Sequence, residues 1–498
     1  MKISTIVVST LLTVSSLASA QTGAFPAVPL TDKLAPFIMT HEVSQKAGAT
    51  AEWRKMEGVA LDEKNNKLYL AISDIGEGMA DREGDIALDA NPCGAVYTAD
   101  LDADFNITKL EPLVVGGPYD ETAEANACAL DNIASPDNLA VDAQGRVWIG
   151  EDTGYHTNNM LWVFDPKTKD LKRFATVPLG AEVTGLSVTP TGTVFMNVQH
   201  PDPTNIYPFN RGIIGVVTGF NANTDDFSAA AVPQGGAQKQ PHVAAGQYQM
   251  LGRVGDLLPE ATDGSSFGEI TTVSGQALSF CNDPDGNMFL SNNSAGTEGY
   301  LYTNFECRPG GVSKLYIRQD AQGKWQTLEG ERVNFAGVNG TWNNCNAKVT
   351  PWGTGLSGEE YPAESADDWQ ESAEAMSAYL GHAANPYDYG YIIELAPAEG
   401  VGTDVTKHYA MGRISAEHGL VMPDARTTYY GDDGTDRVLY KFVADEADNL
   451  DAGTLYAAKV KQRANGSFNL KWLKLGHGVS DEVYAGIRKL DTQLQANN

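Results

Sequence analysis

The feature that most constrains this fold is a strand-turn-strand unit that recurs along the chain. Each copy has a short apolar strand, a turn rich in Asp, Asn, Pro or Gly, and a second strand of β-branched or aromatic residues that ends on polar residues. Repetition at this scale is typical of architectures built from stacked units. The copies begin at Glu57 (EGVALDEKNNKLYLAISD), Asp137 (DNLAVDAQGRVWIGED), Thr184 (TGLSVTPTGTVFMNVQH), Gln276 (QALSFCNDPDGNMFLSNN), Cys345 (CNAKVTPWGTGLSGEE) and Glu417 (EHGLVMPDARTTYYGDD).

A second set of hairpins lies between these units, so each unit predicts a four-stranded sheet. They begin at Gly94, Met160, Gly311 and Gly390, with a further group at Val438 and Gly453. Six such sheets predict an all-β fold, a six-bladed β-propeller forming a single domain over 21–498. Two stretches do not fit a blade, at about 221–275 and 361–386. The second includes an acidic helical pattern over 363–382. We expect both to be helical or loop insertions on one face.

The first 20 residues are typical of a Sec signal peptide. Lys2 precedes an apolar stretch from Ile3 to Val14, and Ala18-Ser19-Ala20 forms an A-x-A cleavage pattern before Gln21. No later apolar run is long enough to span a bilayer. The sequence therefore predicts a periplasmic or secreted protein without a membrane anchor.

The formal charge of −29 limits the partners of this chain. It argues against binding to nucleic acid and to anionic membrane surfaces. An anionic substrate would also be repelled, unless bound cations reverse the local field.

The five cysteines all follow the predicted signal peptide. In an oxidising compartment an even set would pair and one cysteine would be left over. Cys93 with Cys128 and Cys281 with Cys307 are plausible pairs that leave Cys345, although spacing does not determine the connectivity.

Aligning the units on their first strand places two sets of polar residues at one end of a central channel. The first strands begin at Glu57, Asp137, Thr184, Gln276, Cys345 and Glu417, and the second strands end at Asp74, Glu151-Asp152, Gln199-His200, Asn292-Asn293, Glu359-Glu360 and Asp432-Asp433. So many carboxylates would repel one another unless protonated or neutralised by cations. Oxygen ligands suit calcium, and the Cys345 thiolate argues for a transition metal as well.

More ordinary roles remain open for several of these residues. Asp152 and Asp432 could bind strand-end amides, and His200 could be a structural cap. Arg54 and Lys55 precede Glu57 and are either ion-pair partners of the acidic residues or groups that hold a substrate anion.

The segment NCNAKVTPWGTGLSGEE from Asn344 resembles the signature of the PhoX-type alkaline phosphatases, which is close to N-C-x-G-G-x-T-P-W-G-T-W-L-T-C-E-E-N. Further similar segments are YGYIIEL from Tyr389, GRISAEHG from Gly412, YYGDDGTDRVLYKFV from Tyr429 and LDAGTLYAAKV from Leu450, with SPDNLAVDAQGRVWIGED from Ser135 and TGTVFMNVQHP from Thr191. The order of these blocks differs from that of the family. A closed ring tolerates such a circular permutation, because a cut at another blade leaves the same neighbours in contact.

The resemblance implies a six-bladed propeller that hydrolyses phosphomonoesters with a cluster of iron (Fe3+) and calcium (Ca2+) ions. It implies that Cys345 ligates iron and that Lys55 lies where the family has a phosphate-gripping arginine. The family's Asn after the glutamate pair is Tyr361 here, so one polar phosphate contact is either lost or replaced by a phenol. The implied carboxylate ligands are Glu360, Glu394, Glu57 and Asp137, with Glu417, Asp432 and Asp433 as further acidic ligands beside Glu359.

We therefore expect a secreted, metal-dependent phosphomonoesterase, a monomer that acts on small phosphate esters, with Lys55, Tyr361 and Arg54 contacting the substrate. The first alternative is a lactonase-type propeller hydrolase with a single calcium, which PDNLAVDAQGRVWIGED also resembles. The second is a non-enzymatic propeller that binds a partner and is held rigid by calcium.

Overall fold

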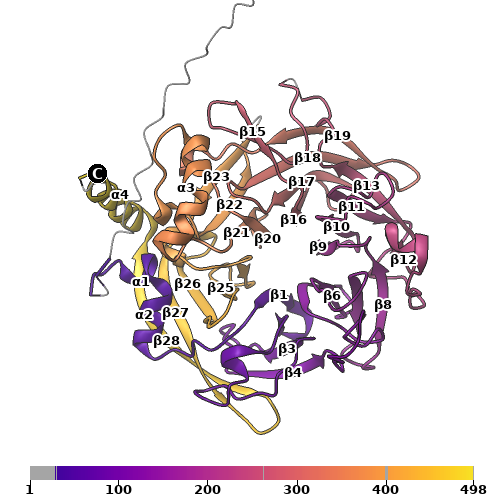
Figure 1. The fold of residues 1–498 in the computed structure, drawn as a ribbon, viewed down its shortest axis with the longest axis horizontal. Helices are drawn as coiled ribbons and strands as arrows, with labels where there is room; N and C mark the ends of the chain where they lie inside the picture. Colours follow the sequence, from indigo (N-terminus) through magenta and orange to yellow (C-terminus); the bar gives the residue numbers. More distant parts are fainter. Residues whose placement is uncertain (1–27, 30, 262, 399–401, 497–498) are drawn as a thin grey trace, which may run out of the picture.

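Antiparallel hairpins build six blades around a common axis (Figure 1). This computed structural model describes residues 28–29, 31–261, 263–398 and 402–496. The predicted six-bladed β-propeller is confirmed. The predicted signal peptide, residues 1–20, lies outside the described residues. None of the described helices has the length and apolar character needed to cross a membrane.

The first three blades follow in chain order. Blade 1 contains β1 (Met56–Asp62), β2 (Lys67–Ile72), β3 (Ala95–Asp100) and β4 (Lys109–Val115). Blade 2 contains β5 (Pro136–Val141), β6 (Val147–Glu151), β7 (Met160–Phe164) and β8 (Leu171–Thr176), and the short β12 (His242–Val243) joins its outer edge. Blade 3 contains β9 (Glu182–Val188), β10 (Val194–Gln199), β11 (Ile213–Thr218) and β13 (Gln247–Arg253).

The remaining blades complete the ring. Blade 4 contains β16 (Pro284–Ser291), β17 (Glu298–Phe305), β18 (Gly311–Gln319) and β19 (Trp325–Arg332). Blade 5 contains β20 (Asn344–Val349), β21 (Gly355–Glu359), β22 (Ile392–Pro397) and β23 (Thr403–Lys407). Blade 6 contains β24 (Leu420–Val421), β25 (Thr427–Tyr430), β26 (Tyr440–Glu446), β27 (Asn449–Gln462) and β28 (Phe468–Val479).

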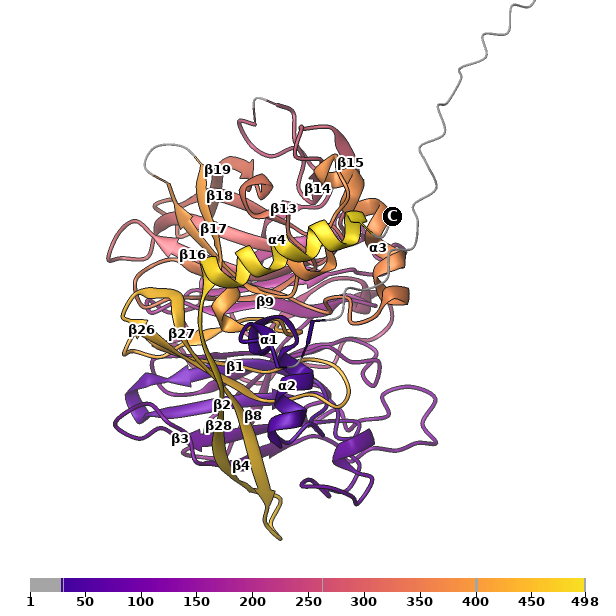
Figure 2. The same ribbon diagram turned by 90° about the vertical axis from the view of Figure 1, so that its left-hand side faces the viewer.

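The ring is closed by hydrogen bonding between its last and first blades. Phe468 and Asn469 of β28 pair with Leu110 and Lys109 of β4, so blades 1 and 6 form one continuous nine-stranded sheet. Helices α1 (Ala35–Ile38), α2 (Thr40–Ala47) and α4 (Ser480–Ala496) pack beside β28 (Figure 2). They therefore cover β28, the strand that joins blade 6 to blade 1.

Glycines next to the axis allow the innermost strands to approach closely. A Cβ at Gly58 would lie 2.2 Å from the Asp137 carbonyl oxygen of the next blade, and one at Gly286 would lie 2.4 Å from the Ala347 nitrogen. Each of these glycines follows an axial carboxylate, Glu57 or Asp285. In Glu57-Gly58 and Asp285-Gly286, the acid faces the channel and the glycine lets the adjacent blade pack closely.

The segment 221–275 differs from the prediction, because part of it belongs to the blades. Residues of β12 and β13 supply outer strands to blades 2 and 3, and the rest leads to the separate hairpin of β14 (Glu269–Thr271) and β15 (Ala277–Phe280). The predicted helix in the second insertion is confirmed as α3 (Ala366–Leu380). Single 3-10 turns occur at Glu63–Asn65, Glu77–Met79, Gly235–Lys239, Ala336–Val338, Pro386–Asp388 and Tyr409–Met411.

The cysteine pairing is confirmed. Cys93 is bonded to Cys128 and Cys281 to Cys307, and Cys345 is free and buried. Both disulfides join segments that flank the channel end of a blade.

The contacts that close the ring predict that truncating Phe468 strongly destabilises the folded protein. Its fully buried ring packs against Trp53 at 5.0 Å and Tyr97 at 5.7 Å between centroids. We expect Phe468→Ala to lower the free energy of unfolding by about 3–5 kcal/mol, because a large core side chain is removed. Phe280→Ala is the matched control, since Phe280 is 60% exposed. Equal denaturant midpoints for the two variants would show that the closing contact contributes little.

Candidate metal centre

The hairpin of β20 and β21 brings its two ends together at the channel, as predicted. Asn344 pairs directly with Glu359, so Cys345 and Glu360 are neighbours across the strand ends. The Cys345 Sγ and the Glu360 and Glu417 carboxylates lie within 4.8 Å of one another. The turn, with Trp352, lies at the opposite end of the blade.

The innermost strands contribute one ring of side chains, here called the inner ring. In four blades its member follows the residue that begins the pairing with the second strand, such as Asp137 after Pro136 and Asp285 after Pro284. In blade 3 the pairing begins at Glu182, two residues before Thr184. In blade 6 the member is Glu417, which lies within 4.8 Å of Glu57 and Asp137. The inner ring consists of Glu57, Asp137, Thr184, Asp285, Cys345 and Glu417.

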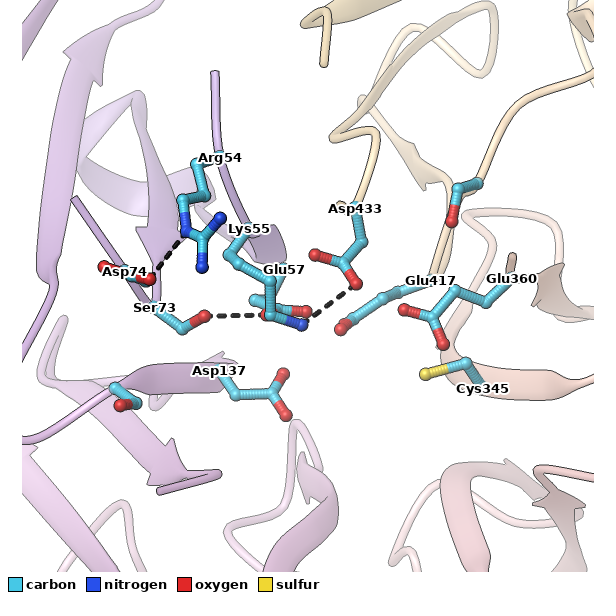
Figure 3. Close-up of polar contacts among 12 residues, drawn as sticks. Arg54, Lys55, Glu57, Ser73, Asp74, Asp137, Cys345, Glu360, Glu417 and Asp433 are labelled. Atoms are coloured by element: carbon cyan, nitrogen blue, oxygen red, sulfur yellow. Dashed lines mark hydrogen bonds and ion pairs between the residues drawn. The ribbon is translucent and has the colours of Figure 1, made fainter. Parts of the chain in front are cut away.

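The second strands contribute another ring, here called the second ring. In four blades its member follows the last residue of the second strand that pairs with the first, as Asp152 follows Glu151 and Glu306 follows Phe305. Gln199 itself pairs with Glu182, and Asp433 lies beyond the end of β25. The second ring consists of Ser73, Asp152, Gln199, Glu306, Glu360 and Asp433. Short contacts join these residues: Ser73 Oγ of the second ring donates to Glu57 at 2.7 Å (Figure 3). Within the inner ring, Cys345 Sγ donates to Asp285 at 3.1 Å.

The electrostatics of the two rings favour protons or cations. Six acids of the two rings have pKa values above their ordinary range. Burial is the largest cause in each, and repulsion from neighbouring carboxylates raises the pKa further. These acids are Glu57, Asp137, Asp285, Glu306, Glu360 and Glu417. Burial, then Asp285 and Glu360, also raises the pKa of the Cys345 thiol. Bound cations would reverse these shifts, because they stabilise carboxylates and thiolates.

The residues of the rings fit a group of metal ions. Within the described residues, the buried Oδ1 atoms of Asp285 and Asp433 have no hydrogen-bond partner. Three further groupings besides Cys345–Glu360–Glu417 hold ligand atoms within 4.8 Å: Asp285–Glu306–Cys345, Glu57–Glu360–Asp433 and Glu57–Asp137–Glu417. Since these groupings share members, adjacent ions would share ligands. The donors combine hard carboxylates with one soft thiolate, which suits calcium together with iron or zinc.

Two hydrogen-bond donors face the rings from the channel mouth. Lys55 Nζ lies 2.8 Å from Glu57 Oε1, 3.1 Å from Asp433 Oδ2 and 3.1 Å from the Tyr361 hydroxyl. The Tyr361 hydroxyl donates to Asp433 Oδ2. Although burial opposes it, Lys55 together with Tyr361 holds the pKa of Asp433 below its ordinary value.

Arg54 lies at the rim rather than in the rings. Its Nε donates to Asp74 Oδ2 at 2.6 Å (Figure 3). Its Nη1 donates to Thr435 at 2.8 Å. The side chain of Arg54 is 25% exposed. The predicted channel residue Asp74 therefore pairs with Arg54, and Ser73 takes the ring position.

A second lysine lies on the other side of the inner ring. Lys348 extends from β20 of blade 5, and its Nζ donates to the Leu139 carbonyl oxygen of blade 2 at 2.8 Å. Burial lowers its pKa to about 8, although Glu417, Asp137 and Asp285 oppose this. The acidic rings thus lie between Lys55 at the mouth and Lys348 deeper in the channel.

Glu359, predicted as a metal ligand, has a structural role instead. Its Oε1 accepts hydrogen bonds from Thr341, Trp342 and Lys407, and its Oε2 accepts from Gly390 and Tyr391. Adjacent strand residues point to opposite faces, so Glu360 points to the channel and Glu359 into blade 5. The prediction for Glu359 is wrong, because its carboxylate is saturated by donors.

Asp432, also predicted as a metal ligand, lies outside the rings as well because its side chain points away from the channel. Its Oδ1 accepts from the Ser415 backbone at 3.0 Å, and its Oδ2 faces His41 of α2 at 3.7 Å. It therefore points toward the N-terminal helices, whereas Asp433 points to the channel.

Glu394 lies at the turn end of blade 5, away from the rings. The register of β22 places it opposite Leu356, near the Trp352 turn. Its Oε1 accepts from Trp352 at 2.6 Å, and its Oε2 lies 2.8 Å from His408 Nε2, which in turn contacts Asp451 of blade 6. The conspicuous TPWGT sequence thus anchors a link between blades rather than the metal centre.

Sequence reasoning missed Asp285 and Glu306, because it aligned the fourth unit on the wrong apolar run. Gln276 lies just before β15 of the separate hairpin, and Asn292-Asn293 lies in the turn at the far end of blade 4. The available signal was the similarity of PDG at 284–286 to PDN at 136–138. The misleading feature was NDPDG, which has the composition of a turn.

Comparisons with known proteins give one family match and several distant structural similarities. A family model described as alkaline phosphatase PhoX matches residues 17–202 and 311–498. No curated protein matches the chain. Distantly similar solved structures include regucalcin, a calcium-binding protein from Agrobacterium tumefaciens str. C58, with 12% identity over 86% of this chain and 93% of that chain and a TM-score of 0.38. A luciferin-regenerating enzyme has 9% identity over 82% and 92% of the two chains and a TM-score of 0.36. At these values neither similarity informs function.

The adjacent glutamates at the end of β21, Glu359 and Glu360, predict opposite phenotypes. We expect Glu359→Gln to lower the free energy of unfolding by about 3–5 kcal/mol, because it leaves the buried Lys407 ammonium without its counterion. Glu360→Gln removes one of several mutually repelling acids, so we expect the metal-free protein to keep or gain stability while losing bound metal. Denaturant unfolding and elemental analysis measure the two effects, and the reverse assignment would contradict the geometry.

The raised carboxylate pKa values predict that metal-free protein becomes less stable as the pH rises. The folded state holds protons that the unfolded state releases near pH 4, so stability is fully present below that pH and is lost as pH rises through the folded pKa values. We expect the Tm of chelated protein to fall between about pH 5 and pH 8, and added metal to raise Tm most at the higher pH. In Glu360→Gln the slope should be smaller. A Tm of the chelated wild type that rises over this range would contradict the prediction.

Proposed function

The chain belongs to the PhoX alkaline phosphatase family, and on that premise we propose that it is an exported, metal-dependent phosphomonoesterase. It would release phosphate from small organic phosphomonoesters with an iron and calcium cluster held by the two rings. The observation that carries this proposal is the Cys345 thiol, which lies among the buried carboxylates of Asp285, Glu360 and Glu417. This donor set distinguishes the site from one built for calcium alone.

The candidate ligands divide by ion type. Cys345, with Glu360 and Glu417, suits iron, whereas the all-oxygen grouping of Glu57, Asp137 and Glu417 suits calcium. When bound, these ions supply the positive charge that offsets the acidic channel and stabilises charge on a transferring phosphoryl group.

Lys55 and Tyr361 supply donors to the substrate rather than bases. Although burial opposes it, Glu57 and Asp433 raise the pKa of Lys55, and burial together with Glu360 raises the pKa of Tyr361. Both groups therefore keep their protons at neutral and moderately alkaline pH. Lys55 Nζ is placed to donate to a phosphate oxygen, and the Tyr361 hydroxyl orients Asp433. Arg54, at the rim, is placed to hold the remainder of the ester.

The cellular setting of the proposal follows from the same chemistry. An exported enzyme meets extracellular phosphate esters and millimolar calcium, the concentration range in which extracellular calcium modules operate. We further propose that the functional unit is a monomer, since the rings are completed by side chains from the six blades of one chain.

The test combines metal analysis with removal of the thiol. We expect protein purified without chelators to contain iron with several calcium ions, and Cys345→Ala to lose the iron and the hydrolysis of 4-nitrophenyl phosphate. Val349→Ala is the control, because Val349 lies on the same strand and is 41% exposed. Calcium at about one per chain without iron, with activity that survives Cys345→Ala, would favour the lactonase-type or binding propeller.

Replacing Lys55 tests its proposed contact with phosphate. We expect Lys55→Met to lower kcat/KM by about 10²–10³-fold, the usual effect of losing one charged donor to the transition state. Lys55→Arg should restore part of the rate, because it keeps the charge. Lys67→Met, on neighbouring β2 and paired with Asp100 at the surface, is the control. Equal rates for Lys55→Met and the wild type would exclude the contact.

A further inference from the structure

Two tyrosines lie together at the channel end of blade 2. Tyr119 is in the connection between β4 and β5, and Tyr155 is in the connection between β6 and β7. Both connections lie at the end of the blade where Asp137 and Asp152 belong to the two rings, because β5 begins there and β6 ends there. The ring centroids are 5.3 Å apart in a T-shaped arrangement.

The tyrosine pair is held in place by covalent and backbone contacts. Tyr119 forms a β-bridge with Cys128, which is bonded to Cys93, and the Cys128 amide donates to the Tyr155 carbonyl oxygen at 3.3 Å. Tyr119 is nevertheless 41% exposed, and Tyr155 is partly exposed. A rigid support beneath exposed aromatic rings is typical of a binding surface, because little conformational entropy is lost when a ligand binds.

The pair lies next to the rim of the candidate site. Asp74 directly precedes Ile75, and Ile75 forms a β-bridge with Asn91, two residues before the Cys93 that is bonded to Cys128 beneath the tyrosine pair. Arg54 is held by Asp74 and directly precedes Lys55, whose ammonium reaches the rings. The connection between β2 and β3 therefore carries both Asp74, which holds Arg54 at the rim, and Cys93, whose disulfide supports the tyrosine pair.

We propose that Tyr119, Tyr155 and Arg54 form a binding subsite for the leaving group of the substrate, and that the preferred substrates are phosphomonoesters that carry a planar aromatic ring. This inference rests on the proposed function, since it places the phosphate at Lys55. The tyrosine rings offer faces and edges to the planar group, and the Arg54 guanidinium stacks on aromatic rings as well. Nucleoside monophosphates and aryl phosphates share this chemistry.

The experiment compares three esters: adenosine 5′-monophosphate, 4-nitrophenyl phosphate and glycerol 3-phosphate. We expect Tyr119→Leu and Tyr155→Leu to raise KM for the aromatic esters about tenfold, the effect of losing one stacking contact, with kcat unchanged. The KM for glycerol 3-phosphate should not change. Tyr155→Phe keeps the ring and should keep the wild-type KM.

The matched control is Tyr300→Leu. Tyr300 belongs to a similar pair with Tyr316, with centroids 5.4 Å apart, on β17 and β18 of blade 4. An increased KM for adenosine 5′-monophosphate alone would assign the subsite to nucleotides, and an increase for both aromatic esters would assign it to planar rings in general. Equal changes for all three esters, or none, would overturn the inference.

Failure of the proposed function gives a different result. If the metal-loaded wild type hydrolyses none of the esters, calorimetric titration with adenosine 5′-monophosphate still tests the subsite. We then expect binding that Tyr119→Leu weakens about tenfold and Tyr300→Leu leaves unchanged. Absence of binding to the wild type, or equal affinity for both variants, would overturn the inference as well.

Discussion

Repulsion among buried carboxylates at the propeller axis is the constraint on which the rest of this structure depends. Each inner strand directs one side chain to the axis, and four of these six side chains are acids. The closed ring fixes their separation, because glycines such as Gly58 and Gly286 pack each inner strand against its neighbour. The acids therefore cannot separate, and the repulsion must be offset by protons or by cations.

The two lysines of the channel offset only part of this charge. Lys55 contacts Glu57 and Asp433 at the mouth, and Lys348 spans from blade 5 to blade 2 on the other side of the inner ring. Asp137, Glu360 and Glu417 have raised pKa values in the absence of metal, and burial is the main cause in each. An arrangement that is costly without cations becomes favourable with them, which couples metal binding to stability.

Strand alternation assigns separate tasks to adjacent acids. In blade 5, Glu359 binds Lys407 inside the protein and Glu360 faces the channel; in blade 6, Asp432 faces α2 and Asp433 faces the channel. Each pair thus joins the metal centre directly to the internal contacts of a blade. The same logic holds in blade 2, where Glu151 accepts from Trp162 and His156 while Asp152 faces the channel.

The sequence by itself determined the blade architecture, the channel end at which the polar residues gather and most of the inner ring. These properties are local, since strand period, turn composition and repeat spacing are all visible in consecutive residues. The sequence could not determine which member of an acidic pair faces the channel, or that Asp285 rather than Gln276 completes the inner ring. Those outcomes depend on register and on partners distant in the chain, such as Lys407 for Glu359 and His408 for Glu394. Only the closed tertiary structure brings such partners together, because one residue of register reverses the face to which a side chain points.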